Sequence, residues 1–276
     1  MRIRATVAAV SVALALSALA VPAAQATGTS GTPYTLNAGF SQLKIASAVK
    51  VGTTNVVHTT YTYTLTHGAD VDIKADDFFS DAYLYRGSLD DPTKTLEGDD
   101  FATCTATTST TATCKGTVDL HPADGELKNA DAGTWTLAAE AFAFNGQDPS
   151  NPDMSKVGFK DQGGMGTTKV QRFSQLTVNA SPEPVYAGKT LTVTGKLSRA
   201  NWEDNHYHGY TKQPVKLQFR KAGTTTYTTV KTVYTDAYGV AKTTTTAHYD
   251  GYWRYSFAGT TTTPAVNATG DYVDVK

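Results

Sequence analysis

Cysteine, charge and long apolar segments are all scarce in this sequence. Of 276 residues, 2 are Cys, 3 are Met and 3 are Trp, and 18% are charged. After one apolar run near the N-terminus there is no second, so we expect no membrane span in the remaining chain. No segment keeps a helical hydrophobic period, which excludes helical bundles. Gly-x-Ser-x-Gly and His-Glu-x-x-His motifs are also missing, which removes two hydrolase signatures.

The N-terminus has the pattern of a secretory signal peptide. Arg2 and Arg4 precede an apolar run from Ala5 to Val21, and Ala24-Gln25-Ala26 follows. A positive segment, an apolar segment and a small-residue cleavage site predict cleavage after Ala26. A membrane anchor is the alternative, but the Ala-rich run is short for a span and a cleavage signal follows it. We therefore expect a signal peptide at 1–26, a flexible leader at 27–33 and a secreted protein.

The charge balance argues against nucleic acid as a partner. Without Arg2 and Arg4 the chain keeps 24 − 2 = 22 basic residues against 25 acidic ones, a net charge of −3. Residues 27–172 hold 11 basic and 18 acidic residues, and residues 173–276 hold 11 and 7. This is not the charge of a nucleic-acid-binding protein. The difference between the halves is interpreted as two solvated surfaces; the alternative is that one half faces a charged surface.

The two cysteines, Cys104 and Cys114, predict one disulfide, because an even count in an exported chain favours pairing. Nine residues rich in Thr separate them and suit two strands around a tight turn. We expect a bridged hairpin. Two Cys without His at finger spacing do not make a metal site.

Short segments with alternating apolar residues dominate the chain and predict strands. In Val57–Leu65 every second residue is expected to face inward, which leaves His58 exposed. Phe142 and Phe144 fall on the outer face of a strand within Ala130–Phe144, so that face is also expected to be covered. Other strands are predicted at these ranges: 35–41, 82–86, 104–120, 167–172, 176–178, 190–197, 214–220, 227–235, 240–248, 252–257 and 271–275.

About seven short strands in each half, with turns between them, predict an all-β protein of two immunoglobulin-like β-sandwiches in tandem. We place the domains at 34–172 and 173–276.

The slipped alternation of Tyr227, Val230 and Val233 predicts a β-bulge. Residues 145–166 have loop composition, and a loop this long is usually functional or disordered.

Two corner sequences sharpen the fold assignment. Asp131-x-Gly133-x-Trp135-x-Leu137 resembles the Asp-x-Gly-x-Tyr-x-Cys corner of immunoglobulin folds, and Asp250-Gly251 before Trp253 is a looser match. The second half also resembles the Ig-like domain of secreted actinobacterial two-domain proteins. That resemblance is carried by Leu176–Pro184, Thr192–Leu197, Val215–Lys221, Asp250–Arg254 and Phe257–Thr260. The first half resembles their partner domain through the Cys104–Cys114 hairpin and Asp131–Trp135. Most such proteins are uncharacterised. Some carry a calcium-binding label, which makes calcium the one cofactor the resemblance implies.

The loop between Arg199 and Gln213 holds the candidate ligand-binding residues Trp202, Tyr207 and Tyr210. Aromatic side chains in a loop at the end of a sandwich can stack on sugars or anchor a protein partner. The alternative is that Trp202 folds back onto the core. His206 and His208 point the same way on an extended chain, which would suit Zn²⁺ with Glu203 or Asp204; the alternative is a polar loop.

Acidic clusters raise the question of calcium. The candidate ligands are Asp70, Asp72, Asp76 and Asp77. Further clusters occur at Asp90, Asp91, Asp99 and Asp100, and at Asp148, Asn151 and Asp153. No calcium-loop motif is present, so solvated acidic loops are the favoured interpretation and we expect no cofactor.

Together these patterns predict a secreted, non-enzymatic binding or adhesion protein that acts on an extracellular protein or glycan surface. The alternative is a structural or calcium-binding component of the cell envelope.

Overall fold

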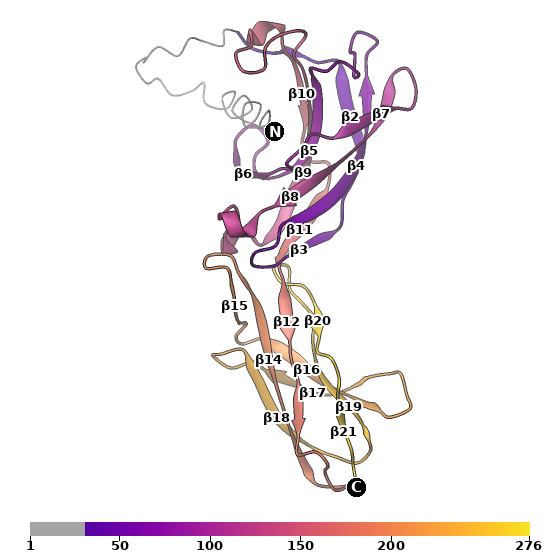
Figure 1. The fold of residues 1–276 in the computed structure, drawn as a ribbon, viewed down its shortest axis with the longest axis vertical. Helices are drawn as coiled ribbons and strands as arrows, with labels where there is room; N and C mark the ends of the chain where they lie inside the picture. Colours follow the sequence, from indigo (N-terminus) through magenta and orange to yellow (C-terminus); the bar gives the residue numbers. More distant parts are fainter. Residues whose placement is uncertain (1–30) are drawn as a thin grey trace, which may run out of the picture. The chain divides into compact units, whose positions relative to one another are not determined.

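A computed structural model describes residues 31–276 of the chain, so the predicted signal peptide and most of the leader lie outside the described residues. Strands dominate this part, accompanied by three 3₁₀ helices of three residues each: η1 (Pro122–Asp124), η2 (Asn129–Asp131) and η3 (Met154–Lys156). Figure 1 shows the order of the strands. The predicted all-β fold class is confirmed.

The chain divides into two compact units that interleave in sequence. The first contains the residues up to Val49, Val57–Leu120 and Thr134–Thr168. The second contains Lys50–Val56, His121–Gly133 and Lys169–Lys276. Two short segments from the N-terminal half thus belong to the second unit. The predicted domain boundary at residue 172 stays a prediction.

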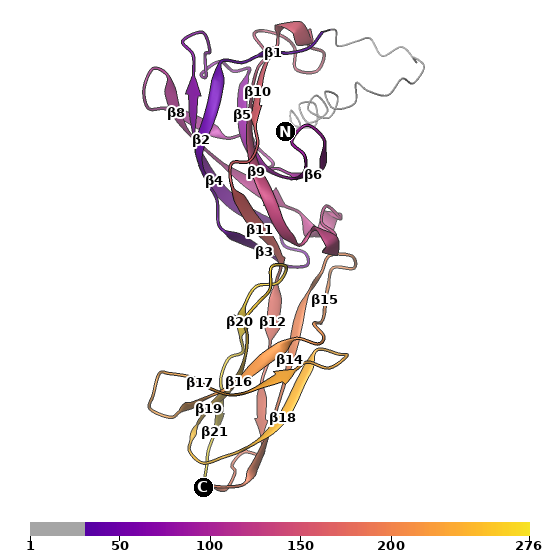
Figure 2. The ribbon, with the colours of Figure 1, turned by 180° about the vertical axis from the view of Figure 1, so that it is seen from behind.

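Two sheets form the first sandwich (Figure 2). The larger has the order β1 (Tyr34–Thr35), β10 (Gly158–Gln162), β9 (Gly133–Ala143), β11 (Thr167–Arg172) and β3 (Ala48–Val51). In addition, β5 (Phe78–Gly87) pairs with β9, and β6 (Pro92–Leu96) pairs with β5. The smaller has the order β2 (Ala38–Lys44), β4 (Val57–His67), β8 (Thr111–Leu120) and β7 (Thr103–Ala106).

The predicted alternation of β4 sets the core between these sheets. Tyr61, Tyr63 and Leu65 are buried, as expected for the inner face of a strand with period 2. The hydroxyl groups of the two tyrosines reach β5 in the facing sheet: Tyr61 donates to Asp81, and the oxygens of Tyr63 and Ser80 are 2.7 Å apart. Apolar burial and hydrogen bonds therefore hold the same two sheets together.

The predicted loop at 145–166 is corrected by the structure, since it contains η3 and the strand β10. Met154 and Val157 from this segment pack on Phe142 and Phe144 and bury both rings. The physical reason is that Phe142, on the outer face of β9, and Phe144, directly after this strand, need a cover. The sequence indicated that cover but did not identify the segment that supplies it.

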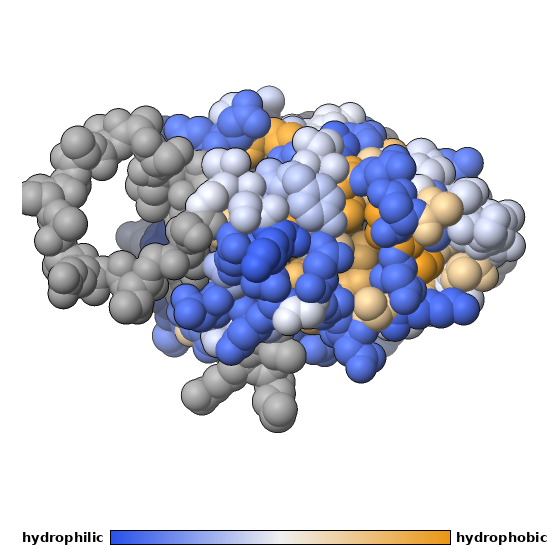
Figure 3. Space-filling model, turned by 90° about the horizontal axis from the view of Figure 1, so that it is seen from above, coloured by the Kyte–Doolittle hydropathy of each residue, from blue (hydrophilic) through white to orange (hydrophobic). Residues whose placement is uncertain are grey.

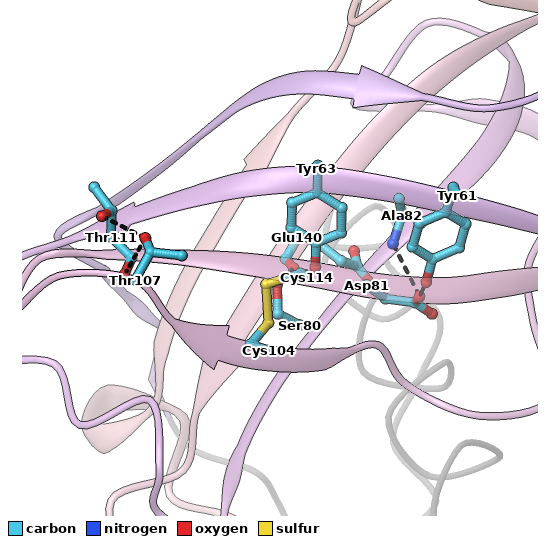
Figure 4. The surroundings of a disulfide bond; sticks show 10 residues. All are labelled: Tyr61, Tyr63, Ser80, Asp81, Ala82, Cys104, Thr107, Thr111, Cys114 and Glu140. Carbon is cyan, nitrogen blue, oxygen red and sulfur yellow. Dashed lines mark hydrogen bonds between the residues drawn. A yellow bond between two sulfur atoms is a disulfide. The ribbon is translucent and has the colours of Figure 1, made fainter.

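The disulfide between Cys104 and Cys114 is present and joins β7 to β8, as predicted (Figure 4). The two residues are directly opposite in the register, with Cα atoms 4.0 Å apart. Thr107 donates its backbone N–H to the Thr111 carbonyl across the turn at 2.8 Å. Counting back along the ladder places the cysteines at a non-hydrogen-bonded pair, where side chains approach most closely.

Two five-stranded sheets form the second sandwich. One is built on β14 (Thr190–Asn201), which pairs with β12 (Ser174–Leu176), β13 (Asn179–Ser181), β15 (His206–Gly209) and β18 (Val240–Thr246). The other has the order β17 (Thr228–Tyr234), β16 (Pro214–Lys221), β19 (Gly251–Phe257) and β20 (Val266–Asn267), with β21 (Asp271–Val273) also on β19.

The core of this unit follows the predicted alternation. Trp253, Tyr255 and Phe257 of β19 are buried, and Tyr255 donates to the Val193 carbonyl of the facing sheet at 3.0 Å. The predicted bulge in β17 is confirmed: Leu217 pairs with Lys231 and Gln218 pairs with Thr229, so Val230 is the extra residue.

Candidate functional site

The predicted ligand-binding loop is largely a hairpin, because β14 runs to Asn201 and β15 begins at His206. Trp202 lies between them and is 1% exposed. Its indole N–H donates to the Gly52 carbonyl at 2.9 Å, and its backbone N–H donates to Asn129 at 3.1 Å. The expectation that Trp202 is an exposed aromatic is corrected. A ring buried to this degree presents no face to a ligand.

The end of this hairpin is occupied by the two segments that the second unit takes from the N-terminal half. Asn129 donates its backbone N–H to Glu203 at 2.9 Å and its side-chain amide to Asn201. Lys128 lies 4.0 Å from the Glu203 carboxylate. Asn205, with its amide turned to satisfy both partners, donates to carbonyls in both segments. The hairpin end therefore acts as a docking point for the chain itself.

Tyr207 and Tyr210, the other two predicted ligand-binding residues, remain partly accessible to solvent. The Tyr210 ring lies 3.8 Å below the Arg199 guanidinium and edge-on to Phe257. Burial raises the pKa of Tyr207. Each ring thus keeps some exposed surface within a packed setting, and ligand contact through Tyr207 and Tyr210 stays a prediction.

The two histidines of the hairpin are arranged around Asp204. The Asp204 carboxylate lies 2.7 Å from Nε2 of His208, and the backbone carbonyl of Asp204 lies 2.5 Å from Nδ1 of His206. Desolvation raises the pKa of Asp204, but the bonds from the His206 N–H and from His208 outweigh it and leave the pKa lowered. Within residues 31–276 no three His, Cys, Asp or Glu side chains come together in a metal-binding group. This geometry therefore gives no support to a zinc site.

The predicted calcium ligands make separate contacts. Asp70 accepts from the side chain of Asn37 at 3.1 Å, and Asp72 accepts from the backbone of Lys74 at 2.9 Å. Asp77 accepts from Gly146 at 2.5 Å. Asp76, the fourth, belongs to no metal-binding group in the described part of the chain. Calcium binding by these residues stays a prediction.

A histidine–carboxylate pair outside the predicted sites joins β4 to β8. Nδ1 of His58 is 2.6 Å from Asp119, whose side chain is 3% exposed while that of His58 is 63% exposed. Asp119 also accepts from the backbone of Asp99 at 2.7 Å and from Thr117 at 3.0 Å. These bonds fix the chain before β7 against β8, so the pair has a structural role.

A shallow groove lies beside that segment in the first unit. Its volume is 520 Å³, and Phe101, Lys115 and several threonines line it.

Hydrophobic residues reach the surface between hydrophilic ones on the molecular face in Figure 3, where no single large apolar area stands out. Exposed large hydrophobic side chains of the described residues are mostly tyrosines.

A surface that the sequence did not reveal lies on the outer face of the β16–β19 sheet. We call it the aromatic–arginine face. It consists of Gln218, Arg220, Tyr227, Tyr252, Arg254 and Tyr272. Strand register brings these residues together, since Gln218 pairs with Arg254, Arg220 pairs with Tyr252, and Tyr252 pairs with Tyr272.

Stacking orders the side chains of this face. The Arg220 guanidinium lies 4.0 Å from the Tyr252 ring centre and 5.3 Å from that of Tyr227. The Arg254 guanidinium lies 3.8 Å from Tyr227. The rings of Tyr252 and Tyr272 are 5.1 Å apart in an edge-to-face arrangement. Cation–π contacts of this kind hold flat side chains in fixed planes.

The hydrogen bonds of the two arginines leave donors available. Arg220 donates to the Thr224 carbonyl at 2.5 Å, and Arg254 donates to the Gln218 amide oxygen at 2.8 Å. Each guanidinium has five N–H donors. The alternation Tyr252–Arg254 was visible in the sequence, but the pairing that joins β16, β19 and β21 was not.

No family model matches the chain, and no curated protein matches it. Solved structures include the Yersinia pseudotuberculosis adhesin InvE, 14% identical over 86% of this chain and 58% of that one, with a TM-score of 0.25. The D0-D1 domain of intimin is 15% identical over 85% of this chain and 98% of that one, with a TM-score of 0.25.

A third solved structure, the ectodomain of mouse nectin-like molecule 4, is 12% identical over 87% of this chain and 65% of that one, with a TM-score of 0.24. The fold assignment rests on the sheets described above. Membership of the actinobacterial family stays a prediction.

Proposed function

We propose that the protein is a secreted, non-enzymatic binding or adhesion protein that contacts an extracellular surface through the aromatic–arginine face. The observation that supports this most is the stacking of Tyr227 and Tyr252 with two arginines on the outer face of a sheet. Tyr and Arg dominate the energetic centres of binding interfaces. Because the strands fix these side chains before binding, little conformational entropy is lost on contact.

One other feature supports the proposal. A disulfide, as between Cys104 and Cys114, is typical of proteins in oxidising, extracellular environments. Among residues 31–276, no helix has the length and hydrophobicity needed to cross a membrane. A structural or calcium-binding role in the envelope is the second proposal, and the calcium experiment in the Discussion addresses it.

The experiment is a binding assay with the purified chain lacking the predicted leader. Cell envelopes of the producing organism serve as the surface. The double variant Tyr252→Ala/Tyr272→Ala is expected to bind at least about tenfold more weakly, as loss of interface anchors does. The matched control is Tyr186→Ala/Tyr238→Ala, which removes two tyrosines that are 68% and 77% exposed but lie outside the face. Equal binding by both double variants would refute the proposed role of the face.

A further inference from the structure

We infer that the ligand of the aromatic–arginine face is an anionic polysaccharide, whose charged groups pair with Arg220 and Arg254 and whose sugar rings lie on Tyr252 and Tyr272. This inference rests on the proposed function of the same face and names the class of its ligand.

The charge of the face is positive. On β16 and β19 the outward positions between Lys216 and Arg220, and between Tyr252 and Ser256, hold three cations and no carboxylate. The contacts of Arg220 and Arg254 are hydrogen bonds to neutral oxygens and ring stacking. The guanidinium charges are therefore not neutralised by the protein. A planar guanidinium binds carboxylate, sulfate or phosphate with two parallel hydrogen bonds.

The composition of the face favours a polar polymer over a protein or a membrane. The same outward positions hold Lys216, Gln218, Arg220, Tyr252, Arg254 and Ser256, with no aliphatic side chain among them. Protein–protein interfaces are also rich in Tyr and Arg, but their buried core adds apolar side chains, which these positions lack. Insertion into a bilayer likewise needs an apolar face. A hydrated chain of sugars requires neither.

The tyrosines lie where sugar rings would be held beside the charges. Tyr252 is between Arg220 and Tyr272 in one cross-strand row. Asp250 and Asp274 adjoin the paired residues Gly251 and Val273, which are next to the Tyr252–Tyr272 pair in the register. Carboxylates therefore lie near the Tyr272 end of the row, so anionic groups of a ligand are directed to the arginine end. Tyr227 is held against the chain at Gly270, where any side chain would collide with its hydroxyl.

The test compares polymers that differ only in charge. Dextran sulfate and polygalacturonate are expected to bind, whereas dextran and methyl-esterified polygalacturonate are not. Binding of the two polyanions is expected to weaken as salt is raised, because the contacts are exposed charges. Arg220→Gln and Arg254→Gln are each expected to lower affinity by about tenfold. The control is Lys242→Gln, which removes one exposed charge from β18 of the other sheet of this unit.

Failure of this inference can be separated from failure of the proposed function. If the tyrosine double variant loses envelope binding but neither polyanion binds, or the arginine variants bind as the parent does, the face is functional and the ligand class is wrong. Equal binding of polyglutamate and polygalacturonate would also overturn the inference, since charge without sugar would then suffice. If the tyrosine variant keeps full envelope binding, both proposals fail. Melting curves of every variant establish that each one is folded.

Discussion

The hydroxyl of Tyr61, on β4, donates a hydrogen bond to the carboxylate of Asp81, on β5 of the facing sheet (Figure 4). Asp81 is 4% exposed and also accepts from the backbone of Ala82 at 2.9 Å. Burial and the neighbouring charge of Asp81 raise the pKa of Tyr61 well above its usual range. A charged group is thus enclosed between two sheets, and its hydrogen bonds are part of what holds the sandwich together.

Removal of this hydroxyl is expected to be costly. Tyr61→Phe leaves a buried carboxylate without one of its donors, so the free energy of unfolding should fall by about 2–3 kcal/mol. Tyr63→Phe is a matched control, because Tyr63 is equally buried and its hydroxyl contacts the neutral Ser80 instead. Its cost should be about 1 kcal/mol. Urea unfolding measures both, and equal costs would contradict a special role for the charge.

The sequence predicted the strands well because alternation is a local property. Val57–Leu65, Pro214–Arg220 and Tyr252–Phe257 each have one apolar face, and each lies within a strand of the structure. Gly158–Gln162 was missed because this strand, which pairs with β1 and β9 in the larger sheet, is partly buried along most of its length and does not alternate. The predicted start of the Trp135 strand at Ala130 was also too early, since η2 occupies Asn129–Asp131 and β9 begins at Gly133.

Trp202 is expected to stabilise the second unit and to take no part in ligand binding. Trp202→Phe removes the indole donor to Gly52 and part of a fully buried ring. The free energy of unfolding should fall by about 2–4 kcal/mol from the lost bond and the cavity. Envelope binding of the folded variant should equal that of the parent. A variant of unchanged stability with weakened binding would return Trp202 to the ligand site.

The candidate site was harder to predict than the fold. Trp202 is near its partners Gly52 and Asn129 only because two segments remote in sequence meet the β14–β15 hairpin. In the same way, Arg220 and Tyr252 are 32 positions apart, and register alone makes them neighbours. Contacts of this kind depend on tertiary pairing, which periodicity does not contain.

Reduction of the disulfide is expected to loosen one hairpin of the first unit and leave the second unit unchanged. Closing so short a ring contributes about 3 kcal/mol or less in the loop-entropy treatment. Cys104→Ala/Cys114→Ala should therefore lower the stability of the first unit by no more than this amount. Hydrogen exchange should accelerate in β7 and the adjoining part of β8. Faster exchange throughout β16 and β19 instead would contradict a local effect.

Calcium is expected to leave the melting temperature unchanged. Asp70, Asp72 and Asp77 already accept hydrogen bonds from separate partners, and the described residues contain no convergent acidic group. An ion that binds the folded chain specifically must raise its stability. Melting curves with calcium chloride and with a chelator, at matched ionic strength, measure this. A rise with calcium that is lost in Asp72→Asn would support the calcium-binding alternative.

Acid is expected to weaken the first unit through Asp119. Burial raises the pKa of this carboxyl, but hydrogen bonds from the backbone of Asp99, from His58 and from Thr117 outweigh it, so the folded pKa is lowered. The unfolded carboxyl has a pKa of about 3.9. As the pH falls through this value towards the lowered pKa, the unfolded chain binds more protons than the folded one, and stability is lost. Above about pH 5 the contribution should be complete.

Asp119→Asn isolates that contribution. The difference in unfolding free energy between parent and variant should be largest near pH 6 and should shrink as the pH falls below about 4, because the unfolded parent then binds a proton at this carboxyl before the folded parent does. Urea unfolding at pH 6, 4.5 and 3 measures the difference. His58→Gln serves as the control: its side chain is exposed, so the contacts of Asp119 with Asp99 and Thr117 should preserve most of the pH dependence. A difference that stays constant with pH would show that Asp119 acts through packing and not through its charge.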